Sequence, residues 1–145
     1  MSTPLSPEIE ARVRAAFDAQ TMMKTIGAYV SGMGAGECEI TLPFAEHIGQ
    51  HHGYAHGGAI GMICDNACGF AAATLAPANT QIVSGEYKIN FLRPAVGEKF
   101  VARGRVRRAG KSMSVCEGEV EAIRDGKPTL IAVMLATMVA VPDAP

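Results

Sequence analysis

The chain has 145 residues, of which 48% are hydrophobic and 19% are charged, and its formal net charge is −1. These values are typical of one folded domain with a substantial core, so we expect a single domain over residues 1–145, and the near-neutral charge argues against nucleic-acid binding. No run of about 20 apolar residues predicts a membrane span, and the N-terminus lacks the basic-then-apolar pattern of a secretory signal. We therefore expect a cytoplasmic protein that binds no membrane.

An N-terminal amphipathic helix is predicted within residues 4–26. Its start signal is Ser6-Pro7-Glu8, so the helix should span about 7–26, and Gly27 should end it. The apolar side chains that recur at helical spacing are Ile9, Val13, Ala16, Phe17, Ala19 and Met23. The remainder of the fold, the core, should then occupy about residues 28–141.

A β-hairpin is predicted next, with strands at 28–33 and 37–44 joined by Gly34-Ala35-Gly36. In the second strand Cys38, Ile40 and Leu42 share one face. The opposite face carries Glu37, Glu39 and Thr41. The strand should therefore bury one face and expose the other.

A second helix is predicted over residues 56–75, after a loop at 45–55, and Pro77 should stop it. It is apolar almost all round, so we expect it to be buried. Asp65 stands near its middle, where an ionised carboxylate needs a partner or a purpose. Gly57 and Gly58 open the helix and leave its first N–H groups uncovered, which favours negative charge at that end.

Long strands are predicted in the C-terminal half, at 81–92, 98–108, 112–124 and 129–141. Gly110-Lys111 and Asp125-Gly126 supply turns between them. Strand 81–92 alternates one set of side chains (Val83, Gly85, Tyr87, Ile89, Phe91) against another (Ile82, Ser84, Glu86, Lys88, Asn90). Strand 129–141 is nearly all apolar, as expected for a strand covered on both faces or at an interface. Together these elements predict an α+β fold with one long helix wrapped by a five- to six-stranded antiparallel sheet.

Neither the cysteines nor the histidines have metal-site spacing, so we expect no metal and no cofactor. We interpret Cys38, Cys64, Cys68 and Cys116 as free thiols that pack as small apolar groups. The four histidines are His47, His51, His52 and His56, and no carboxylate or thiolate stands at a matching distance from them.

The combined pattern resembles the hotdog-fold acyl-CoA thioesterases. It consists of Gln50, then His56-Gly57-Gly58, then Asp65, followed by the strand end Asn90-Phe91-Leu92-Arg93-Pro94. Among these enzymes it is most similar to the phenylacetate-pathway type, which includes 4-hydroxybenzoyl-CoA thioesterases. The resemblance covers about residues 44–141 and implies a hotdog fold and hydrolysis of acyl-CoA without a metal or redox cofactor.

Site residues follow from the resemblance position by position. It implies that Asp65 is the carboxylate acting as nucleophile or general base, and that the Gly57 N–H polarises the thioester carbonyl. It implies that Gln50 orients the reacting groups and that His56 supports the junction between loop and helix. Weaker substrate-binding candidates are Gly58 and Ser84, with Arg108, Lys111 and Ser112 for the CoA phosphates.

Helix geometry separates the two central groups. Eight residues at a rise of about 1.5 Å put Gly57 and Asp65 about 12 Å apart. An attacking group must lie within about 3–3.5 Å of the carbonyl carbon. The simplest resolution is a two-fold dimer that brings Asp65 of one subunit near Gly57 and Gln50 of the other, so we expect an inactive monomer. The exposed sheet and the apolar strand 129–141 further suggest a homotetramer built as a dimer of dimers.

Alternatives remain open at several positions. Arg103 and Arg105 are interpreted as cross-strand partners of Glu117, Glu119 and Glu121 rather than as phosphate ligands. Ser84 could equally be solvent-exposed, and Asp65 could be a structural carboxylate bonded to backbone or to Asn66. Two rival functions are a dehydratase or hydratase of acyl thioesters and a non-catalytic binding protein for acyl-CoA or fatty acid. The sequence does not define the acyl chain.

Overall fold

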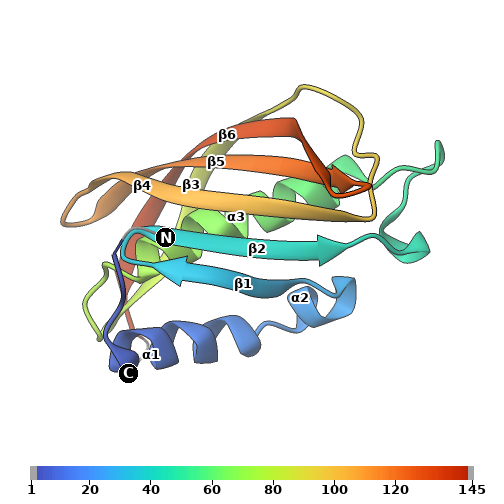
Figure 1. Cartoon of the computed structure of the whole chain (residues 1–145). Coiled ribbons are helices and arrows are strands. Elements are labelled where there is room, and N and C mark those ends of the chain that lie inside the picture. Colours follow the sequence, from blue (N-terminus) through green and yellow to red (C-terminus); the bar gives the residue numbers. More distant parts are fainter. Residues whose placement is uncertain (1–2, 144–145) are drawn as a thin grey trace.

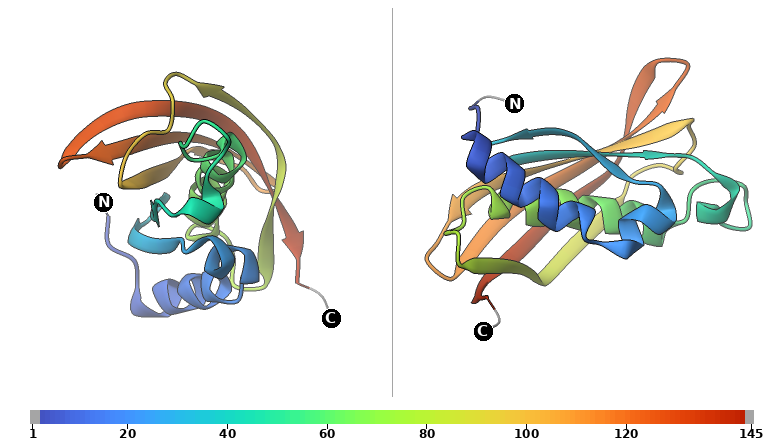
Figure 2. Two further views of the ribbon diagram at one scale, coloured as in Figure 1. Left: turned by 90° about the vertical axis from the view of Figure 1, so that its right-hand side faces the viewer. Right: turned by 90° about the horizontal axis from the view of Figure 1, so that it is seen from below.

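The computed structural model describes residues 3–143 as a six-stranded antiparallel sheet that curves around one long helix (Figure 1). The strand order is β1-β2-β4-β5-β6-β3. The strands are β1 (Tyr29–Gly34), β2 (Glu37–Pro43), β3 (Thr80–Phe91), β4 (Lys99–Ala109), β5 (Met113–Arg124) and β6 (Lys127–Pro142). The helices are α1 (Pro7–Asp18), α2 (Thr21–Ile26), the 3-10 turn η1 (Glu46–Ile48) and the central α3 (Gly57–Ala73). The predicted α+β architecture is confirmed, and α1 lies across α3 on the side away from the sheet (Figure 2).

The N-terminal segment corrects one prediction, because it is two helices and not one. Ser6 caps α1 through Ile9 N–H and Pro7 occupies the first turn, as predicted, but Gln20 has extended backbone that separates α1 from α2. Phe17 and Met23 are both buried, and a spacing of six would put them on different faces of a continuous helix. The break at Gln20 lets both reach the core. Gly27 then ends α2 in the left-handed conformation, with φ 83°.

Helix α3 approaches the sheet so closely that two cross-strand glycines are required beneath it. Gly104 of β4 and Gly118 of β5 are register partners. A Cβ added at Gly104 would lie 2.3 Å from the backbone carbonyl carbon of Ala67, and one at Gly118 would lie 2.5 Å from Cys64 Sγ. Small side chains on α3 and glycines on the strands thus set the distance between helix and sheet.

All four cysteines are free and buried, as predicted. Cys64 and Cys68 lie over Gly118, and the Cys116 thiol donates a weak bond to the Cys68 carbonyl at 3.7 Å. Burial raises the pKa of Cys38 and of Cys116 from 9.0 to about 12. The pKa of Cys68 is also raised, first by its hydrogen bond to Cys64 and then by burial. These thiols behave as small apolar groups of the core.

Strand β3 contains a bulge that overturns the predicted alternation. The pairing of β3 with β6 shifts register between Ser84 and Glu86, so the extra residue Gly85 exchanges the two faces. Before the bulge, Ile82 and Ser84 face α3; after it, Tyr87 and Ile89 do so, and Glu86 turns outward to accept a hydrogen bond from Thr137. A strict period of two had predicted that Ser84 and Glu86 share one face of the strand. The bulge puts them on opposite faces, so that prediction is wrong.

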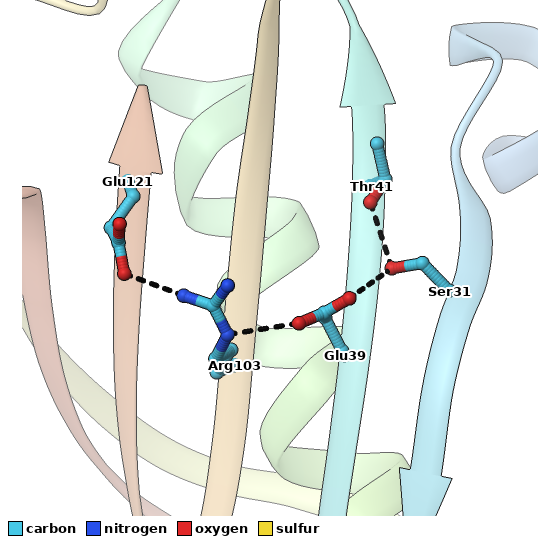
Figure 3. A network of polar contacts seen from close by, with 5 residues as sticks. All are labelled: Ser31, Glu39, Thr41, Arg103 and Glu121. Atoms are coloured by element: carbon cyan, nitrogen blue, oxygen red, sulfur yellow. Dashed lines mark hydrogen bonds and ion pairs between the residues drawn. The ribbon is translucent and has the colours of Figure 1, made fainter. Parts of the chain in front are cut away.

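The outer face of the sheet carries a charged network (Figure 3). Arg103 bridges Glu39 at 2.9 Å and Glu121 at 2.5 Å, and Ser31 donates to Glu39 and accepts from Thr41. Farther along the same strands Glu117 faces Arg105 at 3.5 Å and Arg107 at 3.6 Å. The predicted pairing of Arg103 and Arg105 with glutamates of the next strand is confirmed, with Glu39 as an additional partner.

The apolar strand β6 is covered on one face only within a single chain. Its inward side chains Met134, Ala136 and Met138 are buried, whereas Leu135 is 53% exposed. Coverage of the second face at an interface stays a prediction. None of the helices in the described residues is long and apolar enough to cross a membrane.

Candidate active site

The N-terminus of α3 forms one half of the candidate site. His56 is the N-cap, and its Nδ1 accepts the Gly58 N–H at 2.8 Å. A Cβ at Gly58 would lie 2.9 Å from that same nitrogen, which explains the glycine there. The Gly57 N–H has no acceptor among the described residues, and the ring of Phe91 lies over Gly57, 3.3 Å from where a Cβ would be. A single backbone donor with a positive helix end behind it is thus left available beside an aromatic ring.

Gln50 lies in the loop that leads into this helix start. The loop is closed by the Gly49–Ala55 bridge and by hydrogen bonds from Gln50 N–H to Tyr54 and from His56 N–H to Ile48, each 2.8 Å. The Gln50 side-chain oxygen accepts the His52 N–H. Its amide NH₂ has no acceptor in the described part of the chain, so it remains a donor for another group.

Asp65 forms the other half of the site and is not enclosed in the core. It lies on the stripe of α3 that faces away from β4 and β5, beside the edge strand β3, is half-buried, and accepts a hydrogen bond from the Ser84 hydroxyl at 2.6 Å. The expectation of a helix buried all round is therefore wrong on this stripe. The short bond engages Oδ1 and holds the carboxylate in one orientation, which leaves Oδ2 for another partner.

A cleft of about 620 Å³ opens beside this carboxylate, between α1, α3 and β3. Gln20, at the break between α1 and α2, donates to the side-chain carbonyl of Asn66 at 2.9 Å. At the other end Arg12 donates to the carbonyls of Ala73 and Ala76, at 3.2 and 3.0 Å, where α3 runs out of internal partners. The cleft therefore has polar ends and is bounded by three elements.

The structure brings some predicted site residues together and leaves others apart. Asp65 and Ser84 are in contact, and His56, Gly57 and Gly58 form one unit with the loop of Gln50. The two groups stay separate because eight residues of α3, about 12 Å, lie between Gly57 and Asp65. In a single chain the donor and the carboxylate cannot meet at one carbonyl.

The proposed phosphate ligands lie at the hairpin between β4 and β5, which reaches the end of the sheet opposite the loop of Gln50 (Figure 1). Arg108, Lys111 and Ser112 are exposed, and Ser112 contributes only its carbonyl, to Ala140 N–H at 2.8 Å. Val106 on this strand bonds Gly36, whose own N–H bonds Thr74 at the end of α3. These three residues are therefore distant from the start of α3 in their own chain, and their role stays a prediction.

Sequence reasoning missed two residues that line the cleft, Arg12 and Gln20, which reach α3 from the N-terminal segment and carry no local motif. Phe91 belongs to the predicted strand-end motif, but its position over Gly57 was not foreseen. Gln20 could have been found from the six-residue spacing of Phe17 and Met23, which signals a broken helix. The described residues contain no group of three or more His, Cys, Asp or Glu placed to hold a metal ion.

A long helix wrapped by an antiparallel sheet, with a glycine-led start and an acid on its open side, is the arrangement of the hotdog fold. A family model described as the thioesterase superfamily matches residues 52–129, more than half of the chain. The chain belongs to the thioesterase superfamily, which places it among hydrolases of thioesters and esters. The predicted resemblance is thereby confirmed at the level of the family.

Individual relatives agree with this assignment. A protein of Saccharolobus solfataricus provisionally named an esterase is 33% identical over 109 residues, which cover 75% of this chain and 76% of that protein. The crystal structure of a thioesterase family protein from Silicibacter pomeroyi has a TM-score of 0.91 and 35% identity, covering 92% of this chain and 98% of its own. The PaaI protein from the phenylacetic acid degradation operon of E. coli has a TM-score of 0.84 at 20% identity, covering 97% and 98%, and shows the shared fold.

Proposed function

We propose that the protein hydrolyses acyl-CoA thioesters to a free acid and CoA, with Asp65 as base or nucleophile. The observation that carries the proposal is the position of Asp65 at the cleft, where Ser84 is its one hydrogen-bond partner among the described residues and neither Asn66 nor the backbone, the partners of the structural alternative, bonds the carboxylate. Ser84 engages one carboxylate oxygen and leaves the other for a water molecule or for the carbonyl carbon. Removing a proton from water in this way suits a carboxylate held in a fixed orientation.

The reaction balances with the groups available. As a base, Asp65 takes a proton from water while the oxygen attacks the thioester carbon; as a nucleophile, it attacks that carbon itself and the resulting anhydride is hydrolysed. In both cases negative charge develops on the carbonyl oxygen, and the Gly57 N–H at the helix start stabilises it. The C–S bond then breaks and CoA leaves as the thiolate. Gln50, through its side-chain amide, orients the reacting groups, and His56 fixes the helix start.

A shared site between two copies is supported by the contacts along β3. This strand ends the sheet, so its outer edge has unpaired backbone groups, and most of its residues are exposed. Ser84 contacts Asp65 near the start of the strand, and Phe91 covers Gly57 near its end. Antiparallel pairing of two β3 edges, about a two-fold axis between Tyr87 and Lys88, would put Ser84 opposite Phe91 of the partner subunit. Asp65 would then face Gly57 of the partner subunit.

Further assembly into a dimer of dimers stays part of the proposal. The outer face of the sheet exposes Met113, Val115 and Leu135, which offer apolar area for a second interface. The dimer is the minimal active unit in this scheme, and the cytoplasm is its expected location.

Asp65→Asn tests the proposed chemistry. The amide keeps the size of the side chain but can neither take a proton nor attack, so kcat should fall by about a hundredfold or more while acyl-CoA still binds. Ser84→Ala should cost about tenfold, the effect of one hydrogen bond to a charged group. Asp18→Asn, on the exposed end of α1, is the matched control. Undiminished hydrolysis by Asp65→Asn would refute the proposed role, and binding without turnover in the unaltered protein would favour the non-catalytic alternative.

Mixing two inactive variants tests the shared site. Gly57→Pro removes the N–H donor at a position where proline fits, because it is the first residue of α3 and His56 has ψ 135°. Gly57→Ala keeps the donor but adds, as proline does, a Cβ 3.3 Å from the Phe91 ring, so it controls for crowding. If the site is shared, subunits of Asp65→Asn and Gly57→Pro that reassociate should regain about a quarter of full activity, because half the dimers hold one intact site. No recovery after proven subunit exchange would refute the shared site.

A further inference from the structure

The cleft beside Asp65 runs along α3, away from the carboxylate. Its wall on this helix begins at Asp65 and ends at Ala73, eight residues later, or about 12 Å along the helix axis. Strand β3 forms the second wall, from Ser84 beside the carboxylate back to Thr80 at the far end. The N-terminal segment forms the third wall, from Gln20, just after α1, at the near end to Arg12 of α1 at the far end.

The middle and the ends of the cleft differ in chemistry. Its middle is apolar, with Val13 and Ala16 of α1 opposite Phe70 and Ile82. Phe70 is held there by the edge-to-face contact with Phe17, whose ring centroid is 5.4 Å away. The far end is bounded by Arg12, which joins α1 to the last carbonyls of α3. A ligand that enters beside Asp65 thus meets apolar walls first and the Arg12 contact last.

We propose that this cleft holds the acyl group of the substrate and that α1 sets the maximum acyl length. The inference rests on the proposed thioesterase function, because it assigns the acyl part of the same substrate to the side of Asp65. The substrate class is acyl-CoA with a short or medium acyl group, since the acyl group must fit between Asp65 and the Arg12 contact, about 12 Å along the helix. Ala16 lines the cleft between its Gln20 end and its Arg12 end, so the size of its side chain should limit the length of the acyl group that fits.

Charge argues that the CoA moiety lies elsewhere. The cleft includes the carboxylates Asp65 and Asp143, and its cation Arg12 already donates to two carbonyl groups. Phosphate groups would meet repulsion there without a free guanidinium fork to bind them. An uncharged acyl group gains from the apolar middle and needs no such partner. At the near end, Asn66 Nδ2 and Gln20 Oε1 have no partner within residues 3–143, so they can bond a polar substituent close to the carbonyl.

The test compares two phenylalanine substitutions on neighbouring residues of α1. Ala16→Phe puts a ring into the cleft, whereas Ala15→Phe adds the same ring at an exposed position that does not line it. The kcat/KM values are measured for saturated acyl-CoAs from butanoyl to hexadecanoyl. Ala16→Phe should lower the ratio of decanoyl-CoA to butanoyl-CoA hydrolysis by about tenfold, and Ala16→Leu by less, because each methylene excluded from an apolar pocket has a large cost. Ala15→Phe should leave that ratio unchanged.

Binding of non-hydrolysable thioether analogues, measured by calorimetry on the same variants, separates this inference from the proposed function. If Ala16→Phe, but not Ala15→Phe, shifts the preferred acyl length toward shorter chains in both hydrolysis and analogue binding, the inference is supported. Hydrolysis with the same length profile in Ala16→Phe and Ala15→Phe overturns it and leaves the thioesterase standing. No hydrolysis, but a length shift in analogue binding, keeps the acyl cleft and refutes the proposed function. Absence of both hydrolysis and binding overturns both.

Discussion

The two sides of α3 differ in how tightly they are packed. On the side toward β4 and β5, the helix lies so close to the strands that only glycine fits at Gly104 and Gly118, beneath small residues of the helix. The other side is half-buried, polar at Asp65 and Asn66, and borders a cleft. One helix thus combines a rigid attachment with an open working face, and its position relative to the sheet fixes where Asp65 points. The chemistry of the site therefore depends on packing that never touches a substrate.

The largest expected effect comes from filling the space under α3. Gly104→Ala would place a methyl group 2.3 Å from the Ala67 backbone, which cannot rotate away, so we expect a loss of about 3 kcal/mol or more in the free energy of unfolding. Gly118→Ala collides with the side chain of Cys64 and should be partly rescued by Cys64→Ala. Ala67→Gly should not rescue Gly104→Ala, because the obstacle there is backbone. Urea unfolding of the single and double variants measures these energies, and a mild effect of Gly104→Ala would show that the sheet side is not tightly packed.

Alkaline pH should weaken the sheet side through its thiols. Burial raises the pKa of Cys38 and of Cys116 from 9.0 to about 12. Below pH 9 the folded and unfolded chains both keep these protons; between pH 9 and about 12 only the folded chain does, so stability falls as pH rises. In urea unfolding, the double variant Cys38→Ala/Cys116→Ala should therefore lose less stability than the unaltered protein between neutral pH and about pH 10. Equal losses in the two proteins would mean that the thiols ionise alike when folded and unfolded.

The sequence was informative on the sheet side and less so on the open side. Strand order cannot be read from a pattern, but strand limits, hairpin turns and the buried row Cys38, Ile40 and Leu42 were predicted because local periodicity reports burial directly. The bulge at Gly85 left no periodic signal, so the prediction that Ser84 shares a strand face with Glu86 was wrong. Its contact with Asp65 depends on one extra residue in β3, and only the three-dimensional register shows it.

The wall of the cleft shows a second reason why the open side of α3 could not be predicted from the sequence. Gln20 and Asn66 are separated by 46 positions, and their contact arises only because α1 breaks at the point where it passes α3. Amide side chains carry no distinctive spacing, so nothing local marks them as partners. Asp65, in contrast, stood out because an acid in an apolar helix conflicts with its own surroundings. Conflicts of that kind can be detected in one sequence, whereas complementary surfaces built from distant segments cannot.

The smallest effect should have the opposite sign and come from the open side. Gly69→Ala adds a methyl group whose nearest neighbour, outside the helix itself, is Met138 Sδ at 3.8 Å, an ordinary contact distance. Alanine is the better helix former by about 0.5–1 kcal/mol, so the free energy of unfolding should rise by that amount. The same glycine-to-alanine change is therefore expected to stabilise on one side of α3 and to destabilise severely on the other. Urea unfolding of Gly69→Ala beside Gly104→Ala measures both, and destabilisation by Gly69→Ala would mean that the cleft side is packed as tightly as the sheet side.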